Sequence, residues 1–187
     1  MRTLVVTAVT VLLLSSGGTL LAQSNDKLIK KRLAPYVSSP MNVVERMLEL
    51  CGVNRNKVVY DLGCGDGRIL VTAAKTYNAR AVGLELSPKW AQVATDKVVE
   101  AGVQDRVRVL QTDMMEASLA EADIVTMYLV SDANSILRPK LEKELRPGAC
   151  VVSHDFEIEG WKPATVETIK GYQRSHSIFV YKMDARR

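Results

Sequence analysis

Eight residues in the first half of the chain, Asp61-Leu62-Gly63-Cys64-Gly65-Asp66-Gly67-Arg68, combine closely spaced glycines with acidic side chains. They follow the apolar run 57–60 and precede residues 69–75, which have one apolar face, so the sequence predicts a strand, a glycine turn and a helix. Glycines let the backbone turn tightly and approach a ligand, and the start of a helix offers unpaired N–H groups. This pattern is typical of a nucleotide-cofactor site, although a glycine turn without a ligand is the alternative.

The spacing of the glycines separates two classes of cofactor. Gly63, Gly65 and Gly67 fall as G-x-G-x-G, whereas the dinucleotide fingerprint is G-x-G-x-x-G, and Arg68 takes the place of its third glycine. Asp61 adds a carboxylate, which would repel a pyrophosphate but suits a cofactor with cationic groups. S-adenosylmethionine (SAM) carries a sulfonium and an ammonium. The loop resembles motif I of the class I SAM-dependent methyltransferases.

Two further acidic residues follow later predicted strands. Glu85 ends the strand 79–85 about twenty residues after the glycines, where an acidic side chain accepts hydrogen bonds from ribose hydroxyls. In the class I family, an aspartate after the next strand accepts from the adenine amino group and its neighbour packs on the ring. The resemblance therefore implies these roles for Asp113 and Met114. Glu85 as a solvated strand end and Asp113 as a turn former are the alternatives.

Strands and helices alternate along the remaining chain. This order predicts an α/β fold, a Rossmann-like doubly wound sheet that is mostly parallel and carries an antiparallel hairpin at its C-terminal end. The other predicted strands are residues 106–111, 124–130 and 149–153, with hairpin strands 164–169 and 177–183. The other predicted helices begin at residues 40, 88 and 131, and the last one is interrupted and restarts at Pro139. Ligands of such sheets bind beyond the carboxyl ends of the strands.

The residues after the fourth predicted strand bear on the methyl acceptor. Met127-Tyr128-Leu129-Val130-Ser131 lacks the [N/D]-P-P-[Y/F] motif of methyltransferases that act on DNA bases or glutamine. Together with Tyr36-Val37, Pro40, Val43, Val44 and the glycine loop, this segment is similar to the small protein-lysine methyltransferases related to those of the mitochondrial adenine nucleotide carrier and the ATP synthase c-subunit. The resemblance covers residues 36–163 and implies transfer to a lysine amine of a protein substrate. A small-molecule or lipid methyltransferase and a non-catalytic SAM-binding module are the alternatives.

Methyl transfer to lysine requires a neutral amine held close to the methyl carbon, with water excluded. A dry channel lined by aromatic rings promotes loss of the ammonium proton by lowering its pKa. We expect Tyr128 to form the wall of this channel, with Tyr36 as a second aromatic residue and His154 and Asp155 in contact with the amine. Packing of Tyr36 within its loop, and an ordinary hydrogen-bonded loop at His154, are the alternatives.

Composition limits the other functions. The chain has 187 residues, of which 47% are hydrophobic and 25% charged, with a formal net charge of +4. These values fit one core-forming domain, which we expect to be a monomer, and nothing in them indicates nucleic acid as a partner. The three cysteines lack a C-x-x-C pair and predict neither a disulfide framework nor a zinc site. The two histidines, His154 and His176, are too few and too isolated to indicate a metal.

The first 22 residues have a different character. Met1-Arg2 precedes an apolar run, and small residues lead to a polar start at Gln23, which is typical of a signal peptide. An uncleaved membrane anchor over residues 4–22 is the alternative, and the basic residues that follow it would then stay inside the cell. We favour export and expect three parts, the leader 1–22, a basic connector 23–35 and the methyltransferase domain 36–187. The predicted location is thus outside the cell or on a membrane.

Overall fold

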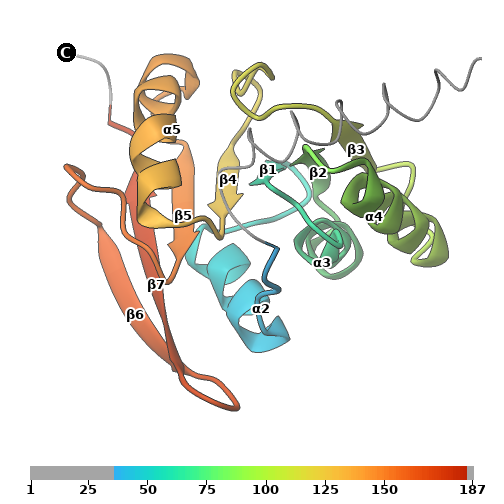
Figure 1. The fold of residues 1–187 in the computed structure, drawn as a ribbon, viewed down its shortest axis with the longest axis horizontal. Coiled ribbons are helices and arrows are strands. Elements are labelled where there is room, and N and C mark those ends of the chain that lie inside the picture. Colours follow the sequence, from blue (N-terminus) through green and yellow to red (C-terminus); the bar gives the residue numbers. More distant parts are fainter. Residues whose placement is uncertain (1–35, 185–187) are drawn as a thin grey trace, which may run out of the picture. The chain divides into compact units, whose positions relative to one another are not determined.

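The computed structural model describes residues 36–184 and contains one seven-stranded sheet flanked by helices (Figure 1). The leader and the basic connector lie outside these residues. Within residues 36–184, no helix has the length and apolar character needed to cross a membrane. The helices are α2 (Met41–Leu50), α3 (Arg68–Tyr77), α4 (Pro88–Glu100) and α5 (Ser131–Glu144). The strands are β1 (Val58–Leu62), β2 (Arg80–Glu85), β3 (Val107–Gln111), β4 (Ile124–Met127), β5 (Cys150–His154), β6 (Thr165–Lys170) and β7 (Ser175–Lys182).

The strand order β3-β2-β1-β4-β5-β7-β6 confirms the predicted sheet. β1 to β5 are parallel, whereas β7 runs antiparallel to β5 and β6 completes the hairpin at the edge (Figure 1). The strand order reverses its direction between β1 and β4, so the carboxyl ends of both strands lie at the kind of crevice that binds ligands in open α/β sheets. Asp61 of β1 lies opposite Thr126 of β4 in this register.

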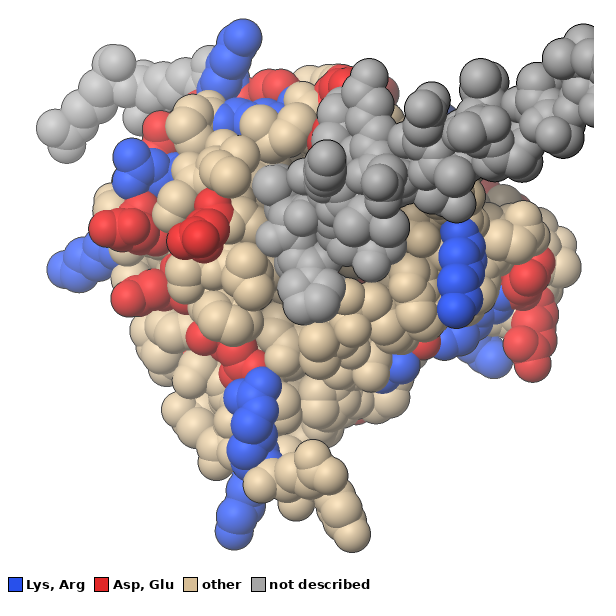
Figure 2. Space-filling view, in the orientation of Figure 1, with Lys and Arg blue, Asp and Glu red and all other residues tan. Residues whose placement is uncertain are grey.

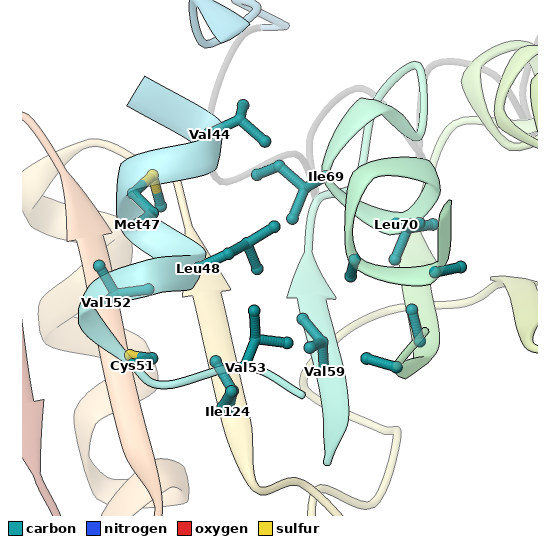
Figure 3. Close-up of a cluster of buried hydrophobic side chains, with 14 of the residues drawn as sticks. Val44, Met47, Leu48, Cys51, Val53, Val59, Ile69, Leu70, Ile124 and Val152 are labelled. Carbon is teal, nitrogen blue, oxygen red and sulfur yellow. The ribbon is translucent and has the colours of Figure 1, made fainter. Parts of the chain in front are cut away.

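Alternating strand residues build two separate cores. Val59 and Ile124 join α2, α3 and α4 in one cluster, part of which Figure 3 shows, whereas Val58 and Val125 join α5 in the other. Every residue of β1, β4 and β5 is buried, because both faces of these strands are covered by helices or loops. The sheet is therefore doubly wound, and its central strands hold the crevice in place.

α5 corrects the prediction of an interrupted helix. The structure has one helix over Ser131–Glu144 with Pro139 inside it. Proline removes one helical hydrogen bond and usually breaks or kinks a helix. Leu137 and Leu141, one on each side of Pro139, are both fully buried in the second core. Burial of this apolar face outweighs the local effect of the proline, which sequence periodicity did not reveal.

A disulfide corrects the prediction that the cysteines form no bridge. Cys51, directly after α2, is bonded to Cys150, the first residue of β5, with their Cα atoms 5.7 Å apart. The two residues are 99 positions apart in the sequence, so no local motif marks the pair. The bridge fastens α2 to the strand that ends at His154. Cys64 of the glycine loop is a buried free thiol, and burial raises its pKa.

Candidate active site

The glycine loop turns sharply between β1 and α3. Gly65 lies in the left-handed region with φ of +53°, and a Cβ atom there would be 2.5 Å from the ring of Tyr36. No side chain larger than hydrogen fits between this loop and the aromatic ring. Tyr36 also stacks on Trp90 of α4, with ring centroids 3.6 Å apart. The structure thus places Tyr36 against the cofactor loop.

Glu85 holds this loop at the end of β2. Its Oε2 accepts a hydrogen bond from the Gly65 N–H at 2.9 Å, and its Oε1 accepts one from the Ser87 N–H at 2.8 Å. The side chain is buried, so these two bonds compensate for the loss of hydration. Because a carboxylate can accept about four hydrogen bonds, both oxygens keep capacity for a ligand hydroxyl. Glu85 is therefore a loop-fastening residue as well as a candidate ribose acceptor, and the sequence predicted only the second role.

Asp61 is the most deeply buried of the predicted cofactor carboxylates, with 4% of its surface exposed. Burial raises its pKa to about 7, although the hydroxyl of Thr126 donates to its Oδ1 at 2.7 Å. The negative charges of Glu85 and Asp66 raise this pKa further. A carboxylate in such a setting gains more from a cationic ligand than a solvated one does. This environment fits the ammonium group of SAM.

Asp66, in the turn of the glycine loop, has the opposite electrostatic setting. It forms ion pairs with Arg68 and Lys97. Burial opposes ionisation of Asp66, but the hydrogen bonds from these two cations outweigh it and lower the pKa to about 2. Arg68 also donates from Nη1 to the carbonyl oxygen of Ser39 at 2.8 Å. Asp66 is thus a structural anion that helps to fasten the loop to the segment before α2.

Met114 and Asp113 follow β3. Met114 is buried, and its terminal methyl lies 3.7 Å from the point that a Cβ atom of Gly63 would occupy. The structure therefore brings Met114 to the glycine loop, as a residue that packs on a cofactor ring requires. Asp113 accepts a hydrogen bond from the Met115 N–H at Oδ1, so it forms a local turn in addition to any contact with a ligand.

A second polar cluster lies beyond the ends of β4 and β5. Tyr128 directly follows β4, and its ring centroid is 3.8 Å from that of His154, the last residue of β5. The Tyr128 hydroxyl donates to Asp155 Oδ2 at 3.1 Å and accepts from Arg174. Arg174 also pairs with Asp155. The predicted residues Tyr128 and His154 are therefore in direct contact.

His154 is fully buried and hydrogen-bonded through both ring nitrogens. Its Nδ1 lies 2.8 Å from the Ser39 hydroxyl, and its Nε2 lies 2.9 Å from Nδ1 of His176. Burial lowers the pKa of His154 to about 4, so its ring is neutral at pH 7. Asp155 has a pKa well below its usual range because hydrogen bonds from Arg174, the Ser177 N–H and His176 outweigh the effect of burial.

The structure also shows residues that the sequence analysis missed. Ser39, Arg174 and His176 all contact His154 or Asp155, although they lie far from these two residues in the sequence. No local motif marks them. The pairing of β5 with β7 places His154 opposite Ile178, which brings His176 to the same end of the sheet. Only this strand order, rather than any spacing in the sequence, could have indicated that the two histidines meet.

Comparisons with known proteins indicate the family to which the chain belongs. The family model described as the ANTKMT methyltransferase domain matches residues 61–165. A protein-lysine N-methyltransferase of Saccharolobus islandicus is 45% identical over 79% of this chain and 92% of its own length. The adenine nucleotide translocase lysine N-methyltransferase of Mus musculus is 34% identical over 79% of this chain, which spans 64% of that protein.

A solved structure gives the same result for the fold and the cofactor. The structure of an RNA methyltransferase from Salinibacter ruber in complex with S-adenosyl-L-homocysteine is 42% identical, with a TM-score of 0.77 over 81% of this chain and 96% of that chain. The fold, the glycine loop and these relatives lead to one conclusion. This chain belongs to the family of the ANTKMT methyltransferase domain and is a SAM-dependent methyltransferase.

Proposed function

We propose that this enzyme transfers the methyl group of SAM to a lysine amine of a protein substrate. The observation that carries the proposal is the 45% identity with the Saccharolobus islandicus protein-lysine N-methyltransferase over 92% of that protein. Two mouse relatives are also named as lysine N-methyltransferases, one for the adenine nucleotide translocase and one for the ATP synthase c-subunit. The clustered aromatic and carboxylate groups beyond β4 and β5 supply suitable chemistry for an amine.

The cofactor side of the site follows from the carboxylates already described. SAM supplies a methyl group on a positively charged sulfur atom. In this proposal, Asp61 pairs with its ammonium group and Glu85 accepts from its ribose hydroxyls. Asp113 and Met114 hold the adenine ring. Gly63, Gly65 and Gly67 let the backbone approach the cofactor closely.

The acceptor side must bind an ammonium group and then favour its neutral form. Asp155 is anionic and attracts the incoming lysine, while the ring of Tyr128 excludes water from one side of the amine. The guanidinium of Arg174 lies at the Tyr128 hydroxyl. Its positive charge lowers the pKa of the ammonium group of an approaching lysine. His154 is neutral and orients this group of side chains. Tyr36 packs its ring against Gly65 of the glycine loop and adds a second aromatic surface to the site.

RNA is the second candidate acceptor, because the related structure from Salinibacter ruber is that of an RNA methyltransferase. An RNA-binding face typically gathers basic side chains to contact phosphates. On the face that Figure 2 presents, Lys and Arg side chains are interspersed with Asp and Glu side chains. We therefore place protein lysine first and keep RNA as a direct outcome of the test.

Labelled methyl transfer separates the acceptors. The purified full chain is incubated with methyl-labelled SAM and a cell extract, which is then divided into protein, RNA and organic fractions. We expect label in protein, recovered as methylated lysine after hydrolysis. Label confined to RNA supports the second candidate, label confined to the organic fraction supports a lipid or small molecule, and absence of transfer despite SAM binding contradicts the proposal.

We also propose that the domain 36–187 follows a leader that directs it to an oxidising compartment or a membrane, and that it is a monomer. The disulfide between Cys51 and Cys150 supports the oxidising compartment, because such bonds persist mainly outside the reducing cytosol. Sequencing the mature N-terminus after cell fractionation tests the leader. A mature chain that starts at Gln23 contradicts the uncleaved anchor. A chain that starts at Met1 in the soluble cytosolic fraction contradicts both the signal peptide and the anchor. Light scattering tests whether the protein is a monomer.

A further inference from the structure

Three ligand-type atoms converge at the end of β5. His154 Nε2, Asp155 Oδ2 and His176 Nδ1 are 2.9, 3.1 and 3.2 Å apart in their three pairs. His154 and His176 are buried, and the Asp155 side chain is 9% exposed. The two histidines are isolated from each other in the sequence, whereas the fold joins them with a carboxylate.

The spacing of these atoms matches that of ligands around one metal ion. Imidazole nitrogens and carboxylate oxygens bind Zn²⁺ at about 2.1 Å in a tetrahedral arrangement, so two ligands are about 3.4 Å apart, a few tenths of an ångström more than the three separations found here. Two histidines and one carboxylate on one side of an ion are also a recognised set for divalent transition metals. The three separations in this cluster therefore need little change to accept such an ion.

The surrounding hydrogen bonds orient the ligands. The Ser39 hydroxyl lies 2.8 Å from Nδ1 of His154, which leaves Nε2 directed at His176 and Asp155. The Ser177 N–H donates to Asp155 Oδ1 at 3.0 Å, which leaves Oδ2 directed at both imidazoles. Metal-binding histidines and carboxylates are typically held in this way by partners on their other polar atoms.

A positive charge already occupies one side of the cluster. Arg174, in the turn between β6 and β7, pairs with Asp155 Oδ2 and donates to the Tyr128 hydroxyl. Its side chain is 55% exposed, so the guanidinium can leave for solvent without opening the core. We propose that His154, Asp155 and His176 bind a divalent transition-metal ion, which displaces the guanidinium of Arg174. The ion would fasten β7 to β5 beside Tyr128; in that state it occupies Asp155 and takes the place of Arg174 as the positive charge near the acceptor amine.

The composition of the chain makes this site easy to test. The sequence contains two histidines, so an untagged full chain gives two imidazole Hε1 resonances by NMR. Titration with ZnCl₂ should shift both resonances together and saturate at one ion per chain, and calorimetry should give the same stoichiometry. Unchanged resonances at millimolar ZnCl₂, or a shift of one resonance alone, would overturn the proposal.

Two variants separate metal binding from a change in folding. His176→Gln should weaken Zn²⁺ binding about 100-fold, because it removes one of three protein ligands. Arg174→Ala should strengthen binding about tenfold, because it removes a cation that competes for Asp155. A variant that merely unfolds cannot gain affinity. Arg46→Ala, which removes a guanidinium that pairs with Glu167 and Glu49 instead of Asp155, is the matched control and should leave affinity unchanged. Equal affinity of the Arg174 and Arg46 variants would show that the ion does not replace the guanidinium.

Discussion

The cofactor loop and the cluster beyond β5 are assembled from the chain in two different ways. The loop is a continuous segment, residues 61–68, and Glu85, Lys97 and the Ser39 carbonyl hold it from outside. The cluster collects Ser39, Tyr128, residues 154–155 and residues 174–177 from segments far apart in the chain. A local motif specifies the first region, whereas the second exists only when α2, β5 and β7 are packed together. We therefore expect the two regions to respond differently to changes in tertiary packing.

Removal of the disulfide should give the largest effect. Cys51→Ala combined with Cys150→Ala frees α2 from β5, and a bridge that closes a loop of this length contributes about 4 kcal/mol to the free energy of unfolding. Urea unfolding, monitored by circular dichroism, measures the loss. Added reductant should destabilise the wild type and leave the double variant unaffected. In the folded variant, methyl transfer should fall more than SAM affinity does. An equal fall of both would show that the two regions are not supported independently.

Asp61→Asn should weaken binding of S-adenosylhomocysteine about 100-fold, because it removes a charge-assisted hydrogen bond in a buried setting. The same substitution relieves the cost of burying the carboxylate, so the unliganded variant should be as stable as the wild type or more stable. Calorimetry and thermal unfolding measure the two quantities. Loss of affinity together with a lower Tm would indicate a structural role, and unchanged affinity would contradict the cofactor role of Asp61.

Tyr128→Ala should lower kcat about 30-fold and change the affinity for SAM less than about twofold, because the ring contributes mainly to exclusion of water from the acceptor. Its ring lies against His154 in the second region, and its hydroxyl bonds to Asp155 and Arg174 instead of the glycine loop. Tyr128→Phe keeps the ring and loses the hydroxyl, so it should retain most of the activity. Labelled-methyl kinetics distinguish the cases. A wild-type kcat in the alanine variant would show that Tyr128 is not part of the acceptor channel.

The same contrast explains what the sequence could predict. The order of strands and helices follows from local patterns, and the described fold confirms it. Asp61, Glu85 and Met114 were placed at strand ends by the same patterns, and their roles toward the cofactor stay predictions. The pairing of Cys51 with Cys150 and the meeting of the two histidines depend on contacts between distant segments, which no periodicity or spacing encodes. Prediction was therefore most complete for the strands around the cofactor loop and least complete for the cluster.

The pKa of Asp61 predicts a pH dependence of cofactor binding. With a pKa of about 7, Asp61 is mostly protonated at about pH 6 and ionised at about pH 8, so affinity for S-adenosylhomocysteine should rise about tenfold between these values. In the unliganded protein the sign is reversed, because a folded pKa above the unfolded value makes stability fall as pH rises from about 4 to about 7. Calorimetry on wild type and Asp61→Asn measures the first effect, and a slope retained in the variant would assign it to another group.

Ser39→Ala should give the smallest effect and tests whether the two regions communicate. The Ser39 carbonyl accepts from Arg68 of the cofactor loop, and its hydroxyl lies 2.8 Å from His154 of the cluster. The alanine variant keeps the carbonyl and loses only the hydroxyl, which contributes about 1 kcal/mol and corresponds to about a fivefold change. We expect kcat to fall by about this factor while SAM affinity stays constant. A fall in SAM affinity as well would show that the orientation of His154 is transmitted through Ser39 to the glycine loop, and the two regions would then form one coupled site.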